Sequence, residues 1–542
     1  MKKKFLVFAR SSRVKLEKVS RFYFTRHFGG VLVFGIFLVF VLAISLRGLP
    51  GNPTADVLNT NQWKQEGPLE LSPERGRFAL LYSVMEDHSF FFSLPVARFV
   101  TPDLGLTSDG RYASLFAPTV SLLVAPGYIA GRWLGASQVG AFSVIAVFAL
   151  LNALLVRSIA IRLGARPSAA SLGAIAFLFG TPAFAYGTTL YQHHVSVFLF
   201  LISLFLLLRS NGWWSLAGIW FCIALSVSVD NPNFFLLAPL GIFAFSRIVS
   251  VSAGEKLNFV VRPILIPTLL VLAVPMAGFL WYNATVNGGP TKLSGTLPAV
   301  TTISSDGQAM SRDLTDISID SVDDGEAKSA VGFFQTRDLL RGFSSHLVSP
   351  DRGVIFYAPV ILFGIFGLVS LARKKGEYGV ANVFVATVAV NLLLYSMWGD
   401  PWGGWAFGSR YLIPSYAILG IGVGIALTEW RKNFFFLGLF FAFLAYSISV
   451  NALGAITSSA NPPQHEVLAI EALSGKVEKY TAERNRDYLH ENGSKSFVYQ
   501  VWANRHMSAD QYYWGIVSVL LFGAGIFFVG IVRESLLEKK RL

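Results

Sequence analysis

Apolar residues occur in long runs along most of this chain, separated by short polar segments. Twelve runs approach the roughly 20 apolar residues that a helix needs to cross the hydrocarbon core of a membrane. They are 29–46, 138–157, 168–186, 194–209, 213–229, 233–249, 263–282, 353–372, 379–397, 411–428, 433–453 and 513–532. The pattern predicts an all-α polytopic membrane protein with about 12 transmembrane helices, since helices satisfy their own backbone groups in lipid.

A thirteenth apolar stretch, Leu115–Trp133, decides the orientation of every later loop. It contains Pro118, Pro126, Gly127 and Arg132, which suit a helix lying at the membrane surface better than a span. If it does not cross, the basic connections all fall on the same side as the basic N-terminus, as the positive-inside rule predicts. We therefore expect twelve spans, with both termini in the cytoplasm.

This topology predicts the organisation of the chain. Nine Lys or Arg residues precede the first span, which reads as an uncleaved anchor. The predicted units are a basic N-terminus (1–28), a transmembrane module (29–282) with a first outer loop (47–137), an outer loop (283–352), C-terminal helices (353–453), an outer helical cap (454–512), and a last helix with a basic tail (513–542). Within the second outer loop, the Ser-, Asp- and Gly-rich piece 301–328 is expected to be mobile.

Composition supports the membrane assignment. Hydrophobic residues make up 53% of the chain and charged residues 14%, which is outside the range of soluble globular domains. The net charge of +13 does not indicate nucleic-acid binding, because the basic residues lie mostly at the ends of apolar runs. The single cysteine, Cys222, lies inside an apolar run and is expected to pack there.

Candidate chemistry concentrates between Ser72 and Tyr112, in the first outer loop. Its carboxylates are Glu74, Glu86, Asp87, Asp103 and Asp109. A carboxylate at the water–lipid boundary can serve as general base towards an acceptor hydroxyl or amine, or hold a divalent metal. The alternative is that Glu74 caps a short surface helix and that Glu86 and Asp87 are solvated loop charges.

This loop resembles the GT-C superfamily of glycosyltransferases that use polyprenyl- or dolichyl-phosphate sugars. The order SPERGRFALLYSVMEDHSFFFS, then DGRYASLFAPTVSLLVAPGYIAG, is similar to the aminoarabinose and protein-mannosyl transferase branch. The resemblance covers roughly residues 25–215 and implies that Glu74 carries the catalytic carboxylate. Pro73 stands where the family has an Asp, so Glu86, Asp87 and Asp109 remain alternatives.

A second cluster, Trp398–Tyr411, lies at the outer mouth of a predicted span. Trp402 and Trp405 suit stacking on a sugar ring, Gly permits close backbone approach, and Arg410 suits a phosphate. The alternative is an aromatic belt with Arg410 reaching lipid headgroups.

Other polar residues on the same predicted face could join a phosphate or substrate site. They are Arg352, Arg111, His193 and His194. Adjacent histidines do not face one way on a helix, so a metal site built on both is not favoured. Asp230–Asn233 reads most simply as a turn and helix cap.

The resemblance implies an inverting glycosyltransferase. It would move a sugar from a polyprenyl-phosphate donor to a lipid, glycan or protein acceptor, from the bacterial inner membrane facing the periplasm. No cofactor is assigned, and a divalent metal is left open. The alternatives are a transporter for lipid or polar solute and a catalytically inactive GT-C-like assembly protein. Coupled transport is disfavoured because the predicted spans contain almost no ionisable residues.

Overall fold

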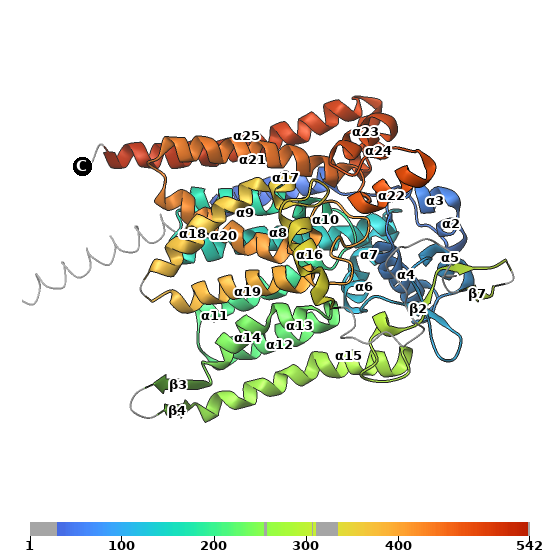
Figure 1. Ribbon diagram of the computed structural model, residues 1–542, viewed down its shortest axis with the longest axis horizontal. Coiled ribbons are helices and arrows are strands. Elements are labelled where there is room, and N and C mark those ends of the chain that lie inside the picture. Colours follow the sequence, from blue (N-terminus) through green and yellow to red (C-terminus); the bar gives the residue numbers. More distant parts are fainter. Residues whose placement is uncertain (1–29, 254–256, 306, 311–333, 375, 540–542) are drawn as a thin grey trace, which may run out of the picture.

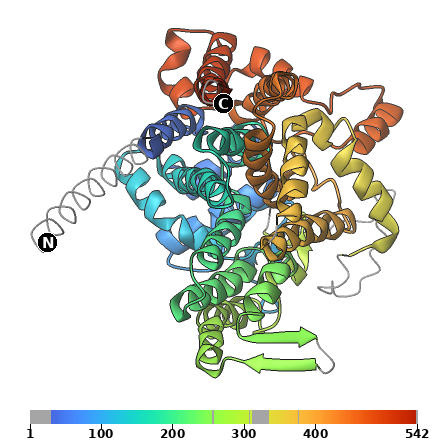
Figure 2. The same ribbon diagram turned by 90° about the vertical axis from the view of Figure 1, so that its left-hand side faces the viewer.

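The chain folds into a bundle of helices that run along one common direction (Figure 1), and a view turned by 90° shows most of them nearly end-on (Figure 2). The computed structural model describes residues 30–253, 257–305, 307–310, 334–374 and 376–539. The predicted basic segment 1–28 and most of the predicted mobile piece 301–328 lie outside these residues.

Within the described residues, six helical segments are long and apolar enough to cross a membrane. They are α8 (Ser137–Arg162), η1 with α15 (Pro263–Val286), α19 (Tyr378–Ser396), η5 with α20 (Arg410–Glu429), α21 (Phe434–Ile456) and α25, within which the apolar segment is Ala509–Leu536. Shorter apolar helices are Gly30–Ser45, α9 (Pro167–Phe179), α11 (His193–Arg209), α12 (Trp213–Val229) and η4 with α18 (Pro359–Arg373). The prediction of a helical membrane protein is confirmed in this coarse form, whereas the count of twelve spans is not.

Proline breaks two of the predicted spans into pieces. The range 233–249 contains α13 (Asn233–Leu236) and α14 (Ala238–Phe245), and Pro239 in the first turn of α14 lacks the N–H that a continuous helix would need. Likewise, α9 stops before Gly180 and Pro182, and α10 (Ala183–Tyr186) follows. These interruptions explain why an apolar run overestimates helix length.

The centre of the bundle is α20, the most buried of the six long segments. It packs against α9 and α18. A Cβ atom at Gly173 of α9 or at Gly367 of α18 would collide with the backbone of α20. Glycine therefore lets these helices approach closely, as is common between helices in membranes.

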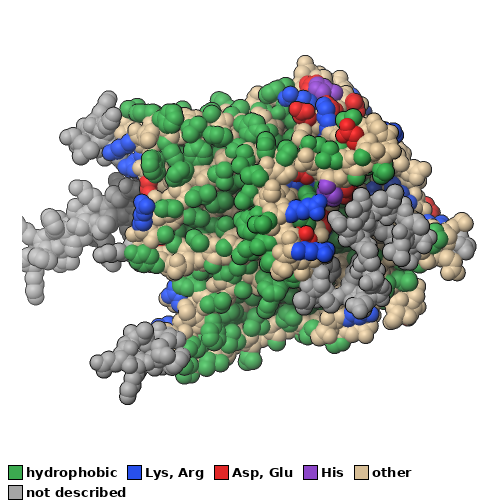
Figure 3. Space-filling model, viewed as in Figure 1, with side chains coloured by type: hydrophobic (Ala, Val, Ile, Leu, Met, Phe, Trp, Pro, Cys, Tyr) green, Lys and Arg blue, Asp and Glu red, His purple; other side chains and the backbone are tan. Residues whose placement is uncertain are grey.

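The two ends of the bundle differ. One end, called here the loop-rich end, lies on the right of Figure 1 and carries most of the short elements. Those labelled there are α2 (Ala55–Leu58), α3 (Asn61–Gln65), α4 (Ser72–Glu86), α5 (Leu94–Val100), α6 (Thr119–Leu123), α7 (Ala125–Trp133), α22 (Gln464–Ser474), α23 (Glu483–Asn492) and α24 (Phe497–Val501). Further short elements of the chain are η2 (Ser294–Thr296), η3 (Thr336–Asp338), α16 (Leu339–Leu347), α17 (Val354–Tyr357) and η6 (Ala503–Arg505). Figure 3 shows an apolar band between the two ends, with charged side chains gathered at each end.

The apolar stretch Leu115–Trp133 forms two short helices, α6 and α7, of five and nine residues. At about 1.5 Å per residue, neither is long enough to cross a bilayer. Gly127 and Gly131 of α7 lie against Gly140 of α8, where an added Cβ would meet backbone atoms. The stretch is therefore docked on the bundle by small residues.

Short antiparallel strands, which the sequence pattern did not predict, occur in three places. β1 (Leu104–Leu106) lies between β2 (Tyr112–Ser114) and β5 (Ala299–Val300), with Leu104 opposite both Ser114 and Val300. β6 (Thr302–Ile303) pairs with β7 (Ala309–Met310) at the same end. β3 (Val249–Ala253) pairs with β4 (Leu257–Val261) at the opposite end of the bundle. The first sheet joins the first loop to the segment that follows α15.

Candidate functional site

Glu74 lies at the start of α4, in the interior of the loop-rich end. Pro73 precedes it in the first helical turn, where a missing N–H costs nothing. Its side chain is fully buried, and its Oε2 accepts hydrogen bonds from the N–H groups of Glu70 and Leu71, each at 3.0 Å. Its Oε1 accepts from the hydroxyl of Thr189. The carboxylate thus binds the free N–H groups ahead of the helix, as an acidic residue in a first turn commonly does.

The protonation of Glu74 differs from that of an exposed glutamate. Burial raises the pKa of this carboxyl, and the neighbouring charge of Glu70 raises it further, while Arg47 and the hydrogen bonds from Thr189 and Leu71 oppose the rise. A carboxyl with a raised pKa is a stronger base towards an acceptor proton than an ordinary one.

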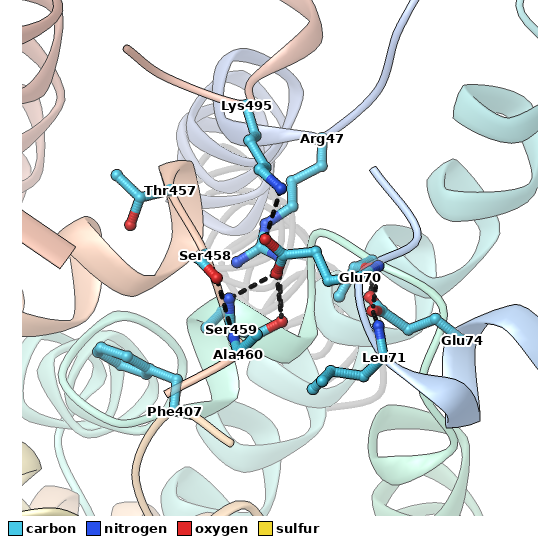
Figure 4. A network of polar contacts seen from close by, with 12 residues as sticks. Arg47, Glu70, Leu71, Glu74, Phe407, Thr457, Ser458, Ser459, Ala460 and Lys495 are labelled. Atoms are coloured by element: carbon cyan, nitrogen blue, oxygen red, sulfur yellow. Dashed lines mark hydrogen bonds and ion pairs between the residues drawn. The ribbon is translucent and has the colours of Figure 1, made fainter. Parts of the chain in front are cut away.

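A buried ionic network lies next to Glu74 (Figure 4). Glu70 pairs with Arg47 at 3.0 Å (Nη1 to Oε2) and with Lys495 at 2.5 Å (Nζ to Oε1). The N–H and hydroxyl of Ser459 also donate to Glu70, at 2.7 and 3.1 Å. Burial alone would raise the pKa of Glu70, but Lys495 and Arg47 hold it at about 2. We call Arg47, Glu70, Ser459 and Lys495 the ionic network.

A second group of polar side chains, called here the polar centre, consists of Arg77, Tyr191, His193, Asp230 and Arg410. The guanidinium of Arg410 lies 5.3 Å from the ring centroid of Tyr191, which stacks on His193 at 5.8 Å. Burial lowers the pKa of Arg77 to about 10, with Asp230 and Tyr191 opposing and Arg410 contributing to the fall. The ring contacts and the effects on the pKa of Arg77 show that these five side chains lie close together, and Glu74 lies next to them.

Several buried atoms of the polar centre have no hydrogen-bond partner among the described residues. They are Nε of Arg77, Nε and Nη1 of Arg410, Nε2 of His193 and the hydroxyl of Tyr191. Nη2 of Arg410 donates to the carbonyl of Gly403 at 2.7 Å. A buried polar group without a partner costs about 1–3 kcal/mol. Two guanidinium groups with unused donors, together in a buried site, are suited to an anion that accepts several hydrogen bonds.

Asp230 adds one carboxylate to the polar centre. It follows the last residue of α12, and its Oδ2 accepts from Nε2 of Gln192 at 3.1 Å. Burial raises the pKa of Asp230, while Arg77, the hydrogen bond from Gln192, and Arg410 lower it. Asp230 is thus a second acid able to exchange a proton beside the two guanidinium groups.

Arg352 lies close to this site but is fully engaged in holding a loop. Its guanidinium donates to the carbonyls of Trp402, Gly404, Ala406 and Asn461, at 2.7–3.1 Å. Gly404 adopts a positive φ of 62°, which brings its carbonyl to this position at no steric cost. The loop that Arg352 organises leads directly into Arg410.

Trp402 and Trp405 pack beneath helix α22. The ring of Trp402 lies 4.1 Å from that of His465, and Nε1 of Trp405 donates to Glu466 at 2.7 Å. Both partners belong to α22. In this arrangement the two tryptophans bind the helix above them, so their predicted role in sugar stacking stays a prediction.

The two adjacent histidines have different surroundings. His193 faces the polar centre, whereas Nε2 of His194 lies 2.7 Å from the carbonyl of Ala183, and Asn152 lies within hydrogen-bonding distance of its Nδ1. His194 is a packed and partnered side chain of α11, and His193 is the member of the pair that can meet a ligand. Helix geometry requires this separation, because consecutive side chains point about 100° apart.

The other predicted acids lie away from the polar centre. Glu86 accepts from Tyr128 and Arg132, at 2.8 and 2.6 Å. Asp109 and Arg111 form an exposed ion pair, and the side-chain hydrogen bonds from Arg111 and Thr107 hold the pKa of Asp109 at about 2. Asp87 and Arg111 line a shallow surface pocket of about 430 Å³. These residues form a separate surface site on the first loop.

Metal binding has little support in the described ranges. They contain no group of three or more His, Cys, Asp or Glu side chains placed to hold a metal ion. Since the polar centre offers only Asp230 and His193, with Glu74 at its border, we derive no step through a metal.

Several residues at these sites were not proposed from the sequence, four of them charged groups that matter most for the arguments below. Arg77 and Asp230 belong to the polar centre, and Glu70 and Lys495 to the ionic network. Arg77 follows Glu74 by three residues on one helix, so spacing on α4 was a usable signal. Asp230 read as a simple turn. Nothing in the sequence links Glu70 to Lys495, which are 425 positions apart.

No protein-family model matches the sequence, and no curated protein matches it. Among solved structures, ArnT from Cupriavidus metallidurans is a structural neighbour, both in the apo state and bound to undecaprenyl phosphate. Sequence identity is 12%, the TM-score is 0.46, and the match covers 94% of this chain and 78% and 77% of those chains. At this distance, neither the activity nor the ligand of those proteins transfers to this chain.

Proposed function

We propose that this chain is an integral-membrane glycosyltransferase that takes a sugar from a polyprenyl-phosphate donor. The observation that carries the proposal is the pair of buried guanidinium groups, Arg77 and Arg410, with unused donors beside the Asp230 carboxylate and next to Glu74. A phosphate group satisfies such donors. The resemblance of the first loop to GT-C transferases supports the same conclusion.

The reaction is a one-step displacement at the anomeric carbon of the donor sugar. The acceptor oxygen or nitrogen attacks this carbon, and the bond from carbon to phosphate oxygen breaks, so configuration inverts. The bonding electrons leave with the lipid phosphate, whose growing negative charge Arg410 and Arg77 stabilise. The acceptor proton passes to a carboxylate. Positioning and charge stabilisation supply most of the rate, because a phosphate ester is a good leaving group.

Glu74 is our first choice for the proton acceptor. Its raised pKa suits a base, and it lies three residues before Arg77 on α4, so one helix carries both base and phosphate ligand. Asp230 is the alternative, because it also has a raised pKa and lies within the polar centre itself. A variant of each residue separates these two assignments.

Residues around Arg410 prepare it for this role. Arg352 fixes the preceding loop, and Nδ1 of His346 on α16 lies 3.0 Å from the hydroxyl of Ser409. A guanidinium held in place before the phosphate arrives loses less entropy on binding. We assign Arg352 and His346 as positioning residues.

One observation favours a second candidate function, that of an inactive GT-C-like assembly protein. Both oxygens of Glu74 already accept hydrogen bonds from the protein, as those of a purely structural cap would. In that case the polar centre binds lipid phosphate without transferring a sugar. Binding without turnover would identify this function.

The test uses the purified full chain in lipid nanodiscs, with polyprenyl phosphate for binding and polyprenyl-phosphate sugars for turnover. We expect Arg410→Gln to lose binding, and Glu74→Gln to retain binding while losing transfer. Asp109→Asn, in the exposed pair with Arg111, is the matched control and should resemble the wild type. Wild-type binding in Arg410→Gln together with wild-type transfer in Glu74→Gln would rule out this site.

We also propose that the loop-rich end faces away from the cytoplasm. The chain has one cysteine, Cys222, inside α12, so a single new cysteine can be labelled selectively after Cys222→Ser. Gly110 lies in the exposed turn between β1 and β2. A Gly110→Cys variant should react with a membrane-impermeant maleimide on intact cells or spheroplasts. Protection until the membrane is lysed would reverse the orientation.

A further inference from the structure

Three distant segments of the chain meet at the carboxylate of Glu70. Arg47 follows the helix Gly30–Ser45, Ser459 follows α21, and Lys495 lies between α23 and α24. All three contact Glu70 directly, and the side chains of Arg47, Glu70 and Lys495 are exposed by 0%, 6% and 7% (Figure 4). The ionic network thus joins the first helix, the first loop and the C-terminal cap.

The network has almost no donors to spare for a ligand. Besides Glu70, Arg47 donates to the carbonyls of Gly454 and Ala455 and to the hydroxyl of Ser459, at 2.5–3.1 Å. The backbone around Lys495 is fixed as well, since its N–H donates to Ile456 at 2.7 Å and its carbonyl accepts from Gly48 at 3.1 Å. A network satisfied in this way holds structure in place and does not bind substrate.

The network reaches Glu74 along two routes. The N–H of Glu70 is one of the two backbone donors that bind Oε2 of Glu74. On the other side, the N–H of Arg47 donates to the carbonyl of Thr188, at 3.2 Å, and the next residue, Thr189, donates its hydroxyl to Oε1 of Glu74. Of the three donors to the Glu74 carboxylate, one therefore belongs to the network, and another belongs to the residue that follows a direct partner of Arg47.

We propose that Glu70, anchored by Lys495 from the C-terminal cap, is a positioning residue that fixes the place and the proton state of Glu74. This inference rests on the proposed function, in which Glu74 accepts the acceptor proton. Glu70 acts through its backbone N–H, which orients the Glu74 carboxylate, and through its charge, which disfavours a second buried anion nearby.

The charged and titratable groups around Glu74 determine in which direction its pKa moves when Glu70 is removed. They are Arg47, which follows the first helix, Glu70, Arg75 and Arg77 from the first loop, and Tyr186 and Tyr191 from the segment after α9. Glu70 is the nearby carboxylate that raises the pKa of Glu74. Removing its charge leaves Arg47 and Lys495 without their counterion, which favours ionised Glu74 further. Loss of Glu70 therefore moves the ionisation of Glu74 to lower pH.

The experiment measures kcat/KM for sugar transfer against pH for the full chain in nanodiscs. In Glu70→Gln, which keeps the backbone N–H and the side-chain shape, we expect the acidic limb to move down by about one pH unit. The double variant Glu70→Gln/Lys495→Met should keep that shift and regain thermal stability, because the unpaired lysine is gone. Lys495→Arg keeps a cation and should stay close to the wild type. Lys476→Met, on an exposed lysine of the cap, is the matched control.

The outcomes separate this inference from the proposed function. If Glu74→Gln abolishes transfer but the acidic limb of Glu70→Gln and of the double variant matches the wild type, the positioning role is wrong. If the wild type transfers no sugar, or Glu74→Gln transfers at the wild-type rate, the proposed function itself is wrong. Should Glu70→Gln fail to fold, the double variant carries the same test.

Discussion

The ionic network and the polar centre are both buried and charged, yet they differ in how completely their groups are paired. In the ionic network, Glu70 accepts from two cations and from Ser459. In the polar centre, Nη2 of Arg410 donates to Gly403, whereas its Nε and Nη1 have no hydrogen-bond partner among the described residues. The charged groups of the ionic network are thus paired with one another, whereas the polar centre keeps hydrogen-bond donors that no described residue accepts.

The difference separates architecture from function. Burying a charge costs several kcal/mol unless it is paired and hydrogen-bonded, so an incomplete cluster persists only where function requires it. We therefore propose the polar centre as the ligand site, and the ionic network as the support that holds Glu74 at its edge. The substitutions below remove groups from each cluster in turn.

Removal of Glu70 should have the largest effect on stability. Glu70→Ala leaves Arg47 and Lys495 buried without a counterion, and breaking such a pair costs about 3–5 kcal/mol. Thermal unfolding of the detergent-solubilised chain measures the loss. Asp487→Ala, which removes an exposed partner of Lys479, is the control and should leave the melting temperature almost unchanged. Equal melting temperatures for both variants would contradict the account of the network.

The same carboxylate predicts a dependence of stability on acid. The pKa of Glu70 is about 2 in the folded chain, below its ordinary value of 4.5. Its contribution to stability is therefore present above pH 4.5 and is lost as the pH falls through the folded value. Unfolding measured between pH 6 and pH 2 should show this loss in the wild type and a smaller one in Glu70→Gln.

Removal of Arg410 should have the largest effect on function. Arg410→Ala is expected to weaken the binding of polyprenyl phosphate and to lower kcat/KM about 100- to 1,000-fold, the usual cost of one donor to a developing charge. The stability of the Arg410→Ala variant should change little, because Nε and Nη1 of Arg410 have no hydrogen-bond partner to lose among the described residues. Arg111→Ala, at the exposed pair with Asp109, is the control. A similar loss of binding in both variants would mean that surface charge, and not the polar centre, attracts the lipid.

The adjacent histidines provide a sharper comparison within one helix turn. His194→Ala removes a partner from Asn152 and from the carbonyl of Ala183, and should destabilise the chain by about 1–3 kcal/mol. His193→Ala should leave stability nearly unchanged but weaken donor binding about tenfold, which corresponds to about 1.4 kcal/mol. Thermal unfolding and donor titration of both variants measure the two effects. If His193→Ala lost stability and His194→Ala lost donor binding, His193 would not belong to the ligand site.

The smallest effect is expected at the surface pair on the first loop. Asp109→Asn breaks an exposed contact with Arg111, and exposed pairs contribute little because solvent screens them. We expect unchanged melting temperature, donor binding and kcat/KM. A loss of transfer in this variant would show that the hairpin of β1 and β2 takes part in the reaction.

The features that the sequence predicted are those that depend on long, local patterns of residues. Apolar runs identified the helical bundle, because burial in lipid requires long stretches of one kind of residue. Helix ends and interruptions, as at Pro239 in α14, depend on single residues and were missed. The short strands depend on pairing between β1 and β5, almost 200 positions apart, which no local pattern records.

The sequence likewise identified only some residues of the candidate site. Glu74, His193 and Arg410 have chemical types that point to a reaction, and the sequence identifies them as candidates. Asp230 and Lys495 do not, because a turn residue and a loop lysine gain a role only through the side chains that folding places beside them. Arg352 donates to the loop carbonyls of Ala406 and Asn461, and its predicted role as a phosphate ligand stays a prediction.

The most direct test of the central claim is an experimental density map of the chain in nanodiscs with bound polyprenyl phosphate. We expect the phosphate within hydrogen-bonding distance of Arg410 and Arg77, with Asp230 and Glu74 facing the adjoining space. Phosphate density at another site, such as the surface pocket beside Arg111, with the donors of Arg410 and Arg77 still unused, would contradict the account.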